Sequence, residues 1–326
     1  MNKRNIDKII HPIKNDFDEF NDRFRSMLNS EVKIINSVIS YLLRNKGKQL
    51  RPILCLLSSK ICGEVNNKSY TSASLIEMLH VATLIHDDVV DESDVRRSWP
   101  TISRIWKNKL SILIGDYIFS RALTNMVKLN SNNALSILSN TAERLSQGEI
   151  LQIERAIKKE MTEEVYYVMI KDKTASLFSA TCAIGAIAAT SSKEKIEALK
   201  KYGEFLGMAF QIKDDLFDII GSIDKTGKPT GFDIKKNMLT LPYIYMLSSV
   251  TPSKKKELLK KINSCIKKNE ISSLRTIIEV NGGLKYAEKK MKEFSDMAID
   301  QLSIFDDSNV KESLIEITKY NLNRTR

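Results

Sequence analysis

Apolar residues recur at helical spacing along most of the 326-residue chain, and this periodicity constrains the fold more than any other feature. Glycine (12) and proline (6) are scarce, so the chain has few signals for turns. One stripe of apolar residues contains Leu75, Met78, Leu79, Ala82, Ile85 and Val89. Similar stripes run through 31–45, 50–62, 111–129, 134–154, 163–189, 195–220 and 238–249. The sequence therefore predicts an all-α bundle of roughly ten or more helices.

Interruptions of the pattern are short. They fall at 63–69, 96–101, 130–133, 190–193 and 222–233. Only the last is rich in glycine and proline, and it lies between two helical stretches. No repeat of fixed period is present, which argues against a solenoid. We therefore predict a single domain that spans residues 1–326.

The net charge of +11 raises the question of a nucleic-acid partner. The lysines are mixed with glutamates and aspartates, as on solvated helix faces, so nucleic-acid binding is disfavoured. Anionic substrates or an anionic membrane surface suit the charge better. The sequence contains no run of ~20 uncharged residues, so no membrane-spanning helix is expected. The charged N-terminus does not resemble a signal peptide. A cytoplasmic protein is the expectation.

Cysteine and histidine offer little chemistry. The four cysteines, Cys55, Cys62, Cys182 and Cys265, form no CxxC pair, so free buried thiols are expected rather than zinc ligands or disulfides. There are only three histidines, which leaves little material for a Ser/His/Asp triad.

Two acidic clusters of the form DDxxD stand out in this apolar background. They are Asp87-Asp88-Val-Val-Asp91 and Asp214-Asp215-Leu-Phe-Asp218. In a helix the first and last aspartates of each cluster lie one turn apart on the same face, where they repel one another unless a cation neutralises them. Magnesium suits such hard oxygen ligands and commonly bridges them to substrate phosphates.

A single DDxxD is typical of a solvated acidic helix turn and would carry little weight alone. Two copies on apolar helices are harder to explain structurally. If the two helices face each other across a bundle, we expect the clusters to form opposite sides of one metal–diphosphate site.

Basic and polar residues lie where such a site would need them. His80 shares a helical face with Asp87 and Asp91, and Arg96-Arg97 follow directly, although adjacent arginines also occur at solvated helix ends. Further candidates, each with an alternative role in packing or solvation, are Lys48 and Arg51 near Pro52, Lys173-Thr174 in an apolar helix, and Phe210-Gln211 before the second cluster.

Eight segments together resemble the trans-isoprenyl diphosphate synthases, in that family's usual order and spacing. The segments are GKQLRP, LIHDDVVDESDVRRSWPT, GDYIFSRAL, QGEILQ, KTASLF, FQIKDDLFDI, TGKPTGFDI and LIEITKY. The resemblance covers nearly the whole chain. It implies an isoprenoid-synthase bundle with a central apolar cavity and a homodimer. It also implies Mg²⁺-dependent condensation of isopentenyl diphosphate onto an allylic diphosphate.

The resemblance also implies roles for individual residues. The principal magnesium ligands would be Asp87, Asp91 and Asp214, supported by Asp88, Asp215 and Asp218. The allylic diphosphate would be held by Arg96, Lys173 and Lys228, and isopentenyl diphosphate by Lys48, Arg51, His80 and Arg97. Near the reacting carbons would lie Thr174, Gln211 and Phe210.

One position departs from the family's pattern. After TGKPTGFD the family usually carries a lysine five residues past the aspartate, whereas this chain has Met238. Either Lys235 or Lys236 supplies the missing charge, or the loop holds substrate more weakly.

Product length should follow from the residues just before the first cluster, where bulky aromatics close the pocket early in short-chain members of the family. Here these residues are Ala82 and Thr83, with Leu79 deeper. We therefore predict a product of six to ten isoprene units, of the kind used for quinone side chains. Release of so apolar a product is expected to involve transient contact with a membrane surface.

Other activities remain as alternatives. A synthase of farnesyl or geranylgeranyl length would have the same motifs. A regulatory subunit of a two-component synthase would share the fold, but such subunits usually lose an aspartate motif, and both are intact here. A class I terpene cyclase would share the first cluster, but it normally has a different second motif and no need for an isopentenyl diphosphate site.

Overall fold

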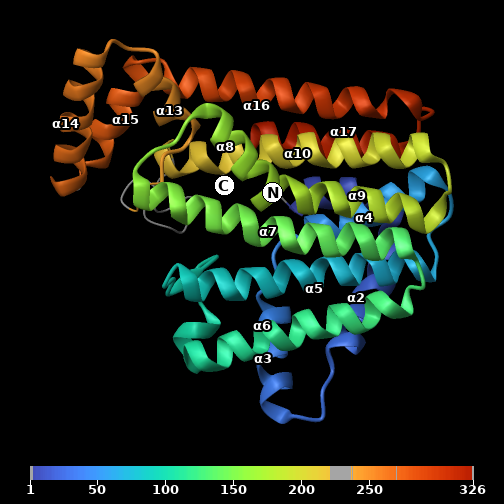
Figure 1. Cartoon of the computed structure of the whole chain (residues 1–326). Helices are drawn as coiled ribbons and strands as arrows, with labels where there is room; N and C mark the ends of the chain where they lie inside the picture. The colour runs from blue at the N-terminus through green and yellow to red at the C-terminus, as the bar shows by residue number, and fades with distance from the viewer. Residues whose placement is uncertain (1–2, 221–235, 237, 269, 325–326) are drawn as a thin grey trace. The chain divides into compact units, whose positions relative to one another are not determined.

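The computed structural model describes residues 3–220, 236, 238–268 and 270–324. It is 84% helical, which confirms the predicted all-α class (Figure 1). The helices of the first half are α1 (Lys3–Ile10), η1 (His11–Ile13), α2 (Lys14–Leu28), α3 (Lys33–Arg44), α4 (Leu50–Cys62), α5 (Asn67–Val90), α6 (Ile102–Lys128) and α7 (Asn132–Lys158). Those of the second half are α8 (Glu163–Ile170), η2 (Lys171–Ala175), α9 (Ser176–Ala189), α10 (Lys193–Ile220), α13 (Leu241–Ser248), α14 (Pro252–Lys268), α15 (Ile271–Val280), α16 (Gly283–Asp300), η3 (Gln301–Ile304) and α17 (Asn309–Asn323). Within the described residues the only strands are β1 (Val95–Arg96) and β2 (Trp99–Pro100).

Each predicted apolar stripe lies mainly on helix. The stripe at 50–62 is α4, and that at 195–220 lies within α10. The stripe at 163–189 is not one regular helix, because η2 is a π-helical turn between α8 and α9. Such a turn leaves one extra residue in the helix and is common at functional sites.

Contacts divide the chain into two compact units. Unit 1 comprises Met1–Ala142, Leu177–Gly203 and Gln301–Ile317, and unit 2 comprises Glu143–Ser176, Glu204–Asp300 and Thr318–Arg326. The helices α7, α9, α10 and α17 contribute residues to both. The single domain predicted for residues 1–326 stays a prediction.

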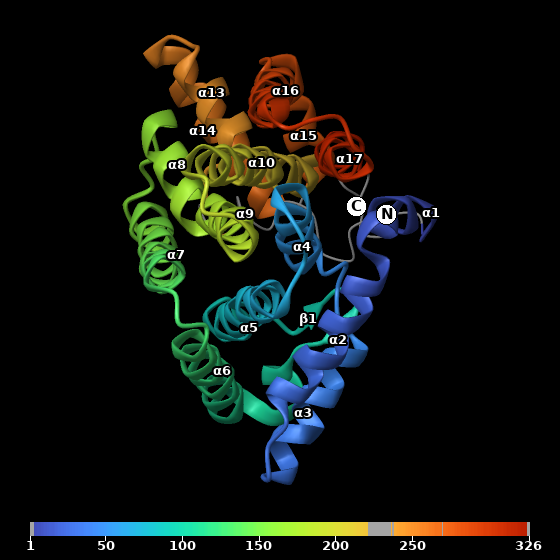
Figure 2. The ribbon, with the colours of Figure 1, turned by 90° about the vertical axis from the view of Figure 1, so that its right-hand side faces the viewer.

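In unit 1 the core forms around α4, which buries eight consecutive residues from Pro52 to Ser59. Helix α5 packs against both α4 and α6 (Figure 2). Gly185 of α9 lies so close to α4 that an added Cβ would be 2.2 Å from the carbonyl oxygen of Cys55. All four cysteines are free, as predicted, and all but the half-buried Cys62 are buried.

In unit 2 the core is made by residues of α8, α10, α13, α14, α15 and α16, with Tyr166 and Tyr243 among its fully buried side chains. Helices α13 and α16 pack closely, since a Cβ on Gly283 would lie 2.3 Å from the carbonyl oxygen of Pro242. Tyr245 and Tyr286 stack between the same helices, with ring centroids 4.0 Å apart. None of the described helices is long and apolar enough to cross a membrane.

Candidate active site

The first aspartate cluster lies at the end of α5. This helix begins with a capping box, in which Asn66 accepts hydrogen bonds from the amides of Lys68 and Ser69 while the Ser69 hydroxyl accepts from the Asn66 amide. It ends at Val90, and the amide of Asp91 still donates to the carbonyl of Asp87 at 2.8 Å. Asp87 and Asp91 therefore lie one helical turn apart, as predicted, and both are half-buried.

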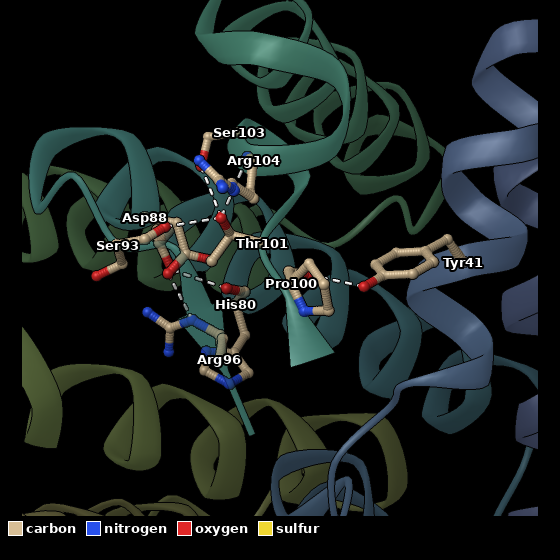
Figure 3. Close-up of polar contacts among 10 residues, drawn as sticks. Tyr41, His80, Asp88, Ser93, Arg96, Pro100, Thr101, Ser103 and Arg104 are labelled. Carbon is tan, nitrogen blue, oxygen red and sulfur yellow. Dashed lines mark hydrogen bonds and ion pairs between the residues drawn. The ribbon is translucent and has the colours of Figure 1, made fainter. Parts of the chain in front are cut away.

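The central aspartate of this cluster is buried and paired. Asp88 is 7% exposed, and Nε of Arg96 donates to its Oδ1 at 2.8 Å (Figure 3). A tight hairpin carries Arg96: β1 and β2 pair with Arg96 opposite Trp99, and the two turn residues Arg97 and Ser98 have φ of 54° and 66°. Positive φ at both central residues is typical of a type I′ turn, whose twist matches the paired strands.

Side chains around the hairpin fix its base. The Thr101 hydroxyl donates to the carbonyl of Ser93 at 2.7 Å and accepts from the amide of Arg104, which caps the start of α6. Tyr41 of α3 donates to the carbonyl of Pro100 at 2.7 Å (Figure 3). The sequence predicted a break at 96–101 but not this hairpin.

Three of the residues predicted to hold isopentenyl diphosphate are close together in unit 1. Nη1 of Arg51 lies 3.0 Å from Nε2 of His80, and the Arg51 guanidinium lies over the ring of Phe178 at 4.7 Å. The Arg97 guanidinium packs against Gly47 of GKQLRP, where a Cβ would be 2.0 Å from Nη1, so a larger residue at this position would displace the end of the Arg97 side chain. The fourth residue, Lys48, is exposed.

This basic cluster perturbs the residues that it surrounds. Burial lowers the pKa of His80 well below its ordinary value, and the positive charges of Arg51, Arg97 and Arg96 lower it further. Glu77, one helical turn earlier, is 7% exposed; burial raises its pKa, and Arg51, Arg97 and Lys46 oppose that increase. Glu77 was not among the predicted site residues, although a glutamate inside an apolar stripe is a signal that could have marked it.

The residues assigned to the chain-length pocket lie on the preceding turns of α5. Leu79 and Ala82 are buried. Thr83 is half-buried, and its hydroxyl donates to the carbonyl of His80 at 2.9 Å.

In unit 2 the second cluster lies near the end of α10, and its central aspartate is again buried. Asp215 is 4% exposed; Oδ2 accepts from the Tyr166 hydroxyl at 2.6 Å and Oδ1 accepts from Nε2 of Gln211 at 2.8 Å. The Thr174 hydroxyl donates to Oε1 of Gln211 at 2.6 Å. Burial raises the pKa of Asp215 to about 7, although the two hydrogen bonds oppose this increase.

Asp214 has a different environment from its neighbour. Its side chain is 42% exposed, and Oδ1 lies 2.6 Å from Nη2 of Arg324. Arg324 also donates to the carbonyl of Phe210 at 2.9 Å and lies over the Phe210 ring at 4.0 Å. Asp218 is half-buried.

Lys173 lies within the π-helical turn. It forms an ion pair with Glu149, and its Nζ donates to Oε1 of Gln152 at 3.0 Å. A Cβ on Gly148 would lie 2.5 Å from the Lys173 amide nitrogen, so the glycine of QGEILQ lets α7 approach η2. Met238, which replaces the family's lysine, has its sulfur 3.0 Å from Nε2 of the same Gln152.

Two predicted residues, Lys228 and Lys235, lie outside the described residues. Lys236 is described and half-buried.

Comparisons with known proteins identify the family to which the chain belongs. The polyprenyl synthetase family matches residues 32–280. The chain belongs to the polyprenyl synthetase family. Octaprenyl diphosphate synthase of Escherichia coli (strain K12) is 33% identical over 322 residues, which is 99% of this chain and 100% of that protein. Geranylgeranyl diphosphate synthase of Saccharolobus solfataricus is 33% identical over 316 residues, 94% of this chain and 95% of that protein.

A solved structure extends the likeness to the fold. The polyprenyl synthase of Caulobacter crescentus, crystallised with calcium and isoprenyl diphosphate, is 31% identical and has a TM-score of 0.91 over 98% of each chain. The predicted all-α fold and the predicted prenyltransferase class are thus confirmed. The chain is equally identical, at 33%, to an octaprenyl and to a geranylgeranyl diphosphate synthase, so identity does not distinguish between product lengths.

The aspartates fit the way in which polyprenyl synthetases would hold a magnesium ion. No group of three or more His, Cys, Asp or Glu side chains able to hold a metal is gathered among the described residues. Magnesium usually binds through one or two carboxylates plus water and substrate phosphates, so a complete protein cage is not required. The half-buried pair Asp87 and Asp91 and the partly exposed Asp214 suit that mode, whereas the buried Asp88 and Asp215 already bind other side chains.

Two functional neighbours were missed in the sequence. Tyr166 lies in an apolar helix, where its hydroxyl gave no sign of a partner at Asp215. Arg324 is in the last three residues, beyond the recognised segments, and nothing local links it to Asp214.

Proposed function

We propose that this chain is a magnesium-dependent polyprenyl diphosphate synthase that adds isopentenyl diphosphate head-to-tail onto an allylic diphosphate, giving an all-trans product. The observation that carries the proposal is the set of guanidiniums around His80, on the helix that ends in the first aspartate cluster. The carboxyls of Glu77 and Asp88 offset part of this positive charge, and a bound diphosphate would offset the rest.

We assign roles to the residues as follows. Magnesium and the diphosphate bound to it are held by Asp87, Asp91 and Asp214, supported by Asp88, Asp215 and Asp218. The allylic diphosphate is bound by Arg96, Lys173 and Lys228, and isopentenyl diphosphate by Lys48, Arg51, His80 and Arg97. Around the reacting carbons lie Thr174, Gln211 and Phe210.

Magnesium, when bound, neutralises the charge of the departing diphosphate. Loss of that group leaves an allylic cation, which the double bond of isopentenyl diphosphate attacks, and the departed diphosphate then takes up the proton that is lost. The chain contributes position and fixed charge rather than a nucleophile. Apolar surroundings of α5 and α10 keep water from the cation.

The first test is incorporation of labelled isopentenyl diphosphate with farnesyl diphosphate and magnesium, followed by resolution of the dephosphorylated products by length. We expect a discrete product that disappears on chelation and in Asp87→Ala. No incorporation with any allylic primer would contradict the proposal and favour a regulatory subunit, which a search for a catalytic partner would then test.

We propose a product of six to ten isoprene units, suited to a quinone side chain, because the residues before the first cluster are small. Ala82 is buried on α5, so Ala82→Phe places a ring in the path of the growing chain. We expect this variant to make shorter products at a similar rate. An unchanged product spectrum would contradict the pocket assignment, and a wild-type product of farnesyl or geranylgeranyl length would contradict the length class.

We further propose a cytoplasmic homodimer, acting as a single domain, with transient contact to membranes during product release. Exposed Ile112, Leu123 and Val127 share a face of α6 and suit an apolar interface between copies. Sedimentation analysis of Leu123→Glu should show a shift to monomer.

The lysine-rich, exposed α14 suits an anionic bilayer, and flotation should show more protein on anionic vesicles when product is present.

A further inference from the structure

The two adjacent aspartates that open the second cluster point to different partners. Asp214 is partly exposed and pairs with Arg324, whereas Asp215 is buried and accepts one hydrogen bond on each oxygen. Tyr166 and Gln211 thus occupy both oxygens of Asp215 at ordinary hydrogen-bond lengths. A carboxylate used in this way is poorly placed to bind a metal as well.

The partners of Gln211 fix which end of its amide faces which way. When Asp215 is ionised, both of its oxygens only accept hydrogen bonds, and the NH₂ group of Gln211 then faces Asp215. The carbonyl oxygen of Gln211 must then face Thr174, at 2.6 Å. Because that oxygen only accepts, the hydroxyl proton of Thr174 must point to Gln211.

A directed chain of hydrogen bonds follows, from Thr174 through Gln211 to Asp215, with Tyr166 holding the far carboxylate oxygen. As a result, the hydroxyl proton of Thr174 is held in the hydrogen bond to Gln211. The lone pairs of Thr174 Oγ1 then remain to interact with the positive charge of the allylic cation. Without Asp215 the Gln211 amide can take either of two orientations, and one of them turns its NH₂ group toward Thr174.

We propose that Asp215 is a positioning residue for the prenyl transfer, acting through Gln211 to orient the Thr174 hydroxyl, and that Tyr166 holds Asp215 in place. This assignment rests on the proposed function, in which Thr174 stabilises the allylic cation. It specifies how Asp215 supports the second cluster: Asp215 orients a neutral dipole through Gln211, whereas its neighbour Asp214 binds the metal. A dipole fixed before the reaction stabilises developing charge without reorganising during it.

Two substitutions of unchanged size test the chain of hydrogen bonds. Asp215→Asn places an amide where the carboxylate was, so Gln211 can turn its oxygen toward residue 215. We expect kcat to fall about 20- to 100-fold, and Tyr166→Phe to lower it about 3- to 10-fold. The magnesium concentration for half-maximal rate and both KM values should stay within about twofold of wild type.

The neighbour Tyr167 provides a matched control. It lies on the same helix, and its hydroxyl also donates to a carboxylate, Glu163, at 3.0 Å. Tyr167→Phe should leave kcat unchanged. Asp214→Asn provides the opposite control, because loss of a metal ligand should raise the magnesium requirement at least tenfold.

A double-substitution cycle tests the direction of action. If Asp215 acts through Thr174, Asp215→Asn should cost less than about threefold in a Thr174→Val background. Full additivity of the two effects, or a magnesium requirement in Asp215→Asn that rises as in Asp214→Asn, would overturn the proposal.

A measurement that needs no activity separates this proposal from the proposed function. The side-chain amide protons of Gln211, identified by their loss in Gln211→Met, should exchange slowly with solvent in the wild type and quickly in Asp215→Asn. Slow exchange in an inactive wild type would contradict the proposed function but retain the hydrogen-bond chain. Equal exchange in both proteins would overturn the chain itself, provided that thermal melts show both to be folded.

Discussion

The two DDxxD clusters are alike in sequence but differ in what their central aspartates bind. In the first cluster Asp88 holds a cation, the Arg96 guanidinium, at 2.8 Å. In the second cluster Asp215 holds two neutral groups, the Tyr166 hydroxyl and the Gln211 amide. The outer residues Asp87, Asp91 and Asp218 are half-buried, and the Asp214 side chain is 42% exposed.

This difference shows that a repeated motif need not have repeated chemistry. At i and i+4 the outer aspartates share a face, so both clusters offer a pair of carboxylates to a metal. The middle residue points elsewhere and takes whatever donor the neighbouring element supplies. In unit 1 that element is a hairpin bearing arginine, and in unit 2 it is α8 and the preceding turn of α10.

The largest effects should come from the outer aspartates. We expect Asp87→Ala and Asp214→Ala each to lower kcat/KM by about 10³-fold or more, since each removes charge that holds the metal and the leaving diphosphate. Initial rates over a magnesium titration measure this. The exposed Asp94→Asn and Asp296→Asn serve as controls and should retain wild-type rates. If Asp214→Ala kept a tenth of the activity while Asp87→Ala abolished it, the two clusters would not share a metal role.

A smaller and more selective effect should follow from Asp88→Asn. Arg96 would lose the carboxylate that orients it, so the KM for the allylic diphosphate should rise about tenfold while that for isopentenyl diphosphate changes little. The lost charge-assisted hydrogen bond should also lower the free energy of unfolding by about 1–3 kcal/mol. Steady-state kinetics with each substrate varied, together with denaturant melts, would check both. Equal rises in the two KM values would show that Asp88 does not act through Arg96.

Removing Arg324 should have a milder effect on the second cluster. Arg324→Gln takes away a cation that pairs with Asp214, so the magnesium concentration for half-maximal rate should fall about two- to fivefold. Some stability, about 1 kcal/mol, should be lost with the contact over Phe210. Arg324→Lys keeps the charge and is the matched control. An increased magnesium requirement in Arg324→Gln would mean that Arg324 supports metal binding instead of competing with it.

Much of the fold was predictable because helical periodicity is a local signal. The stripe at 50–62 is α4 in the structure. Asp87 and Asp91 lie one helical turn apart, as predicted, although Asp91 is the C-cap residue of α5. That Arg51, His80 and Arg97 lie close together was predicted from the family resemblance and not from their spacing in the sequence. The local pattern did not predict the π-helical turn at Lys173, which lies against Gly148 of α7.

The internal partners of the clusters were not predictable from the residues. Tyr166 and Asp215, or Arg324 and Asp214, are far apart in the chain, and no periodicity links them. Nor did the two middle aspartates differ in the sequence, since both follow an aspartate and precede two apolar residues. Which donor each finds depends on tertiary packing.

The smallest effect concerns the charge state of His80 beside the first cluster. Because the pKa of His80 is well below its ordinary value in the folded protein, His80 should stay neutral near pH 6, while the unfolded chain takes up a proton below about pH 6.5. The unfolded state then binds more protons, so the free energy of unfolding should fall as pH drops below about 6.5, by at most about 1.4 kcal/mol per pH unit.

Histidine NMR spectra between pH 5 and 7.5 would check this prediction. The signal that is absent in His80→Gln should not titrate in the free protein, and the pH dependence of stability should be flatter in that variant. Inorganic pyrophosphate should raise the pKa of His80, because the anion offsets the guanidiniums around it. A His80 signal that titrates near pH 6.5 without any anion would mean that the basic cluster is already neutralised. The contrast between the cationic surroundings of Asp88 and the neutral partners of Asp215 would then be weaker.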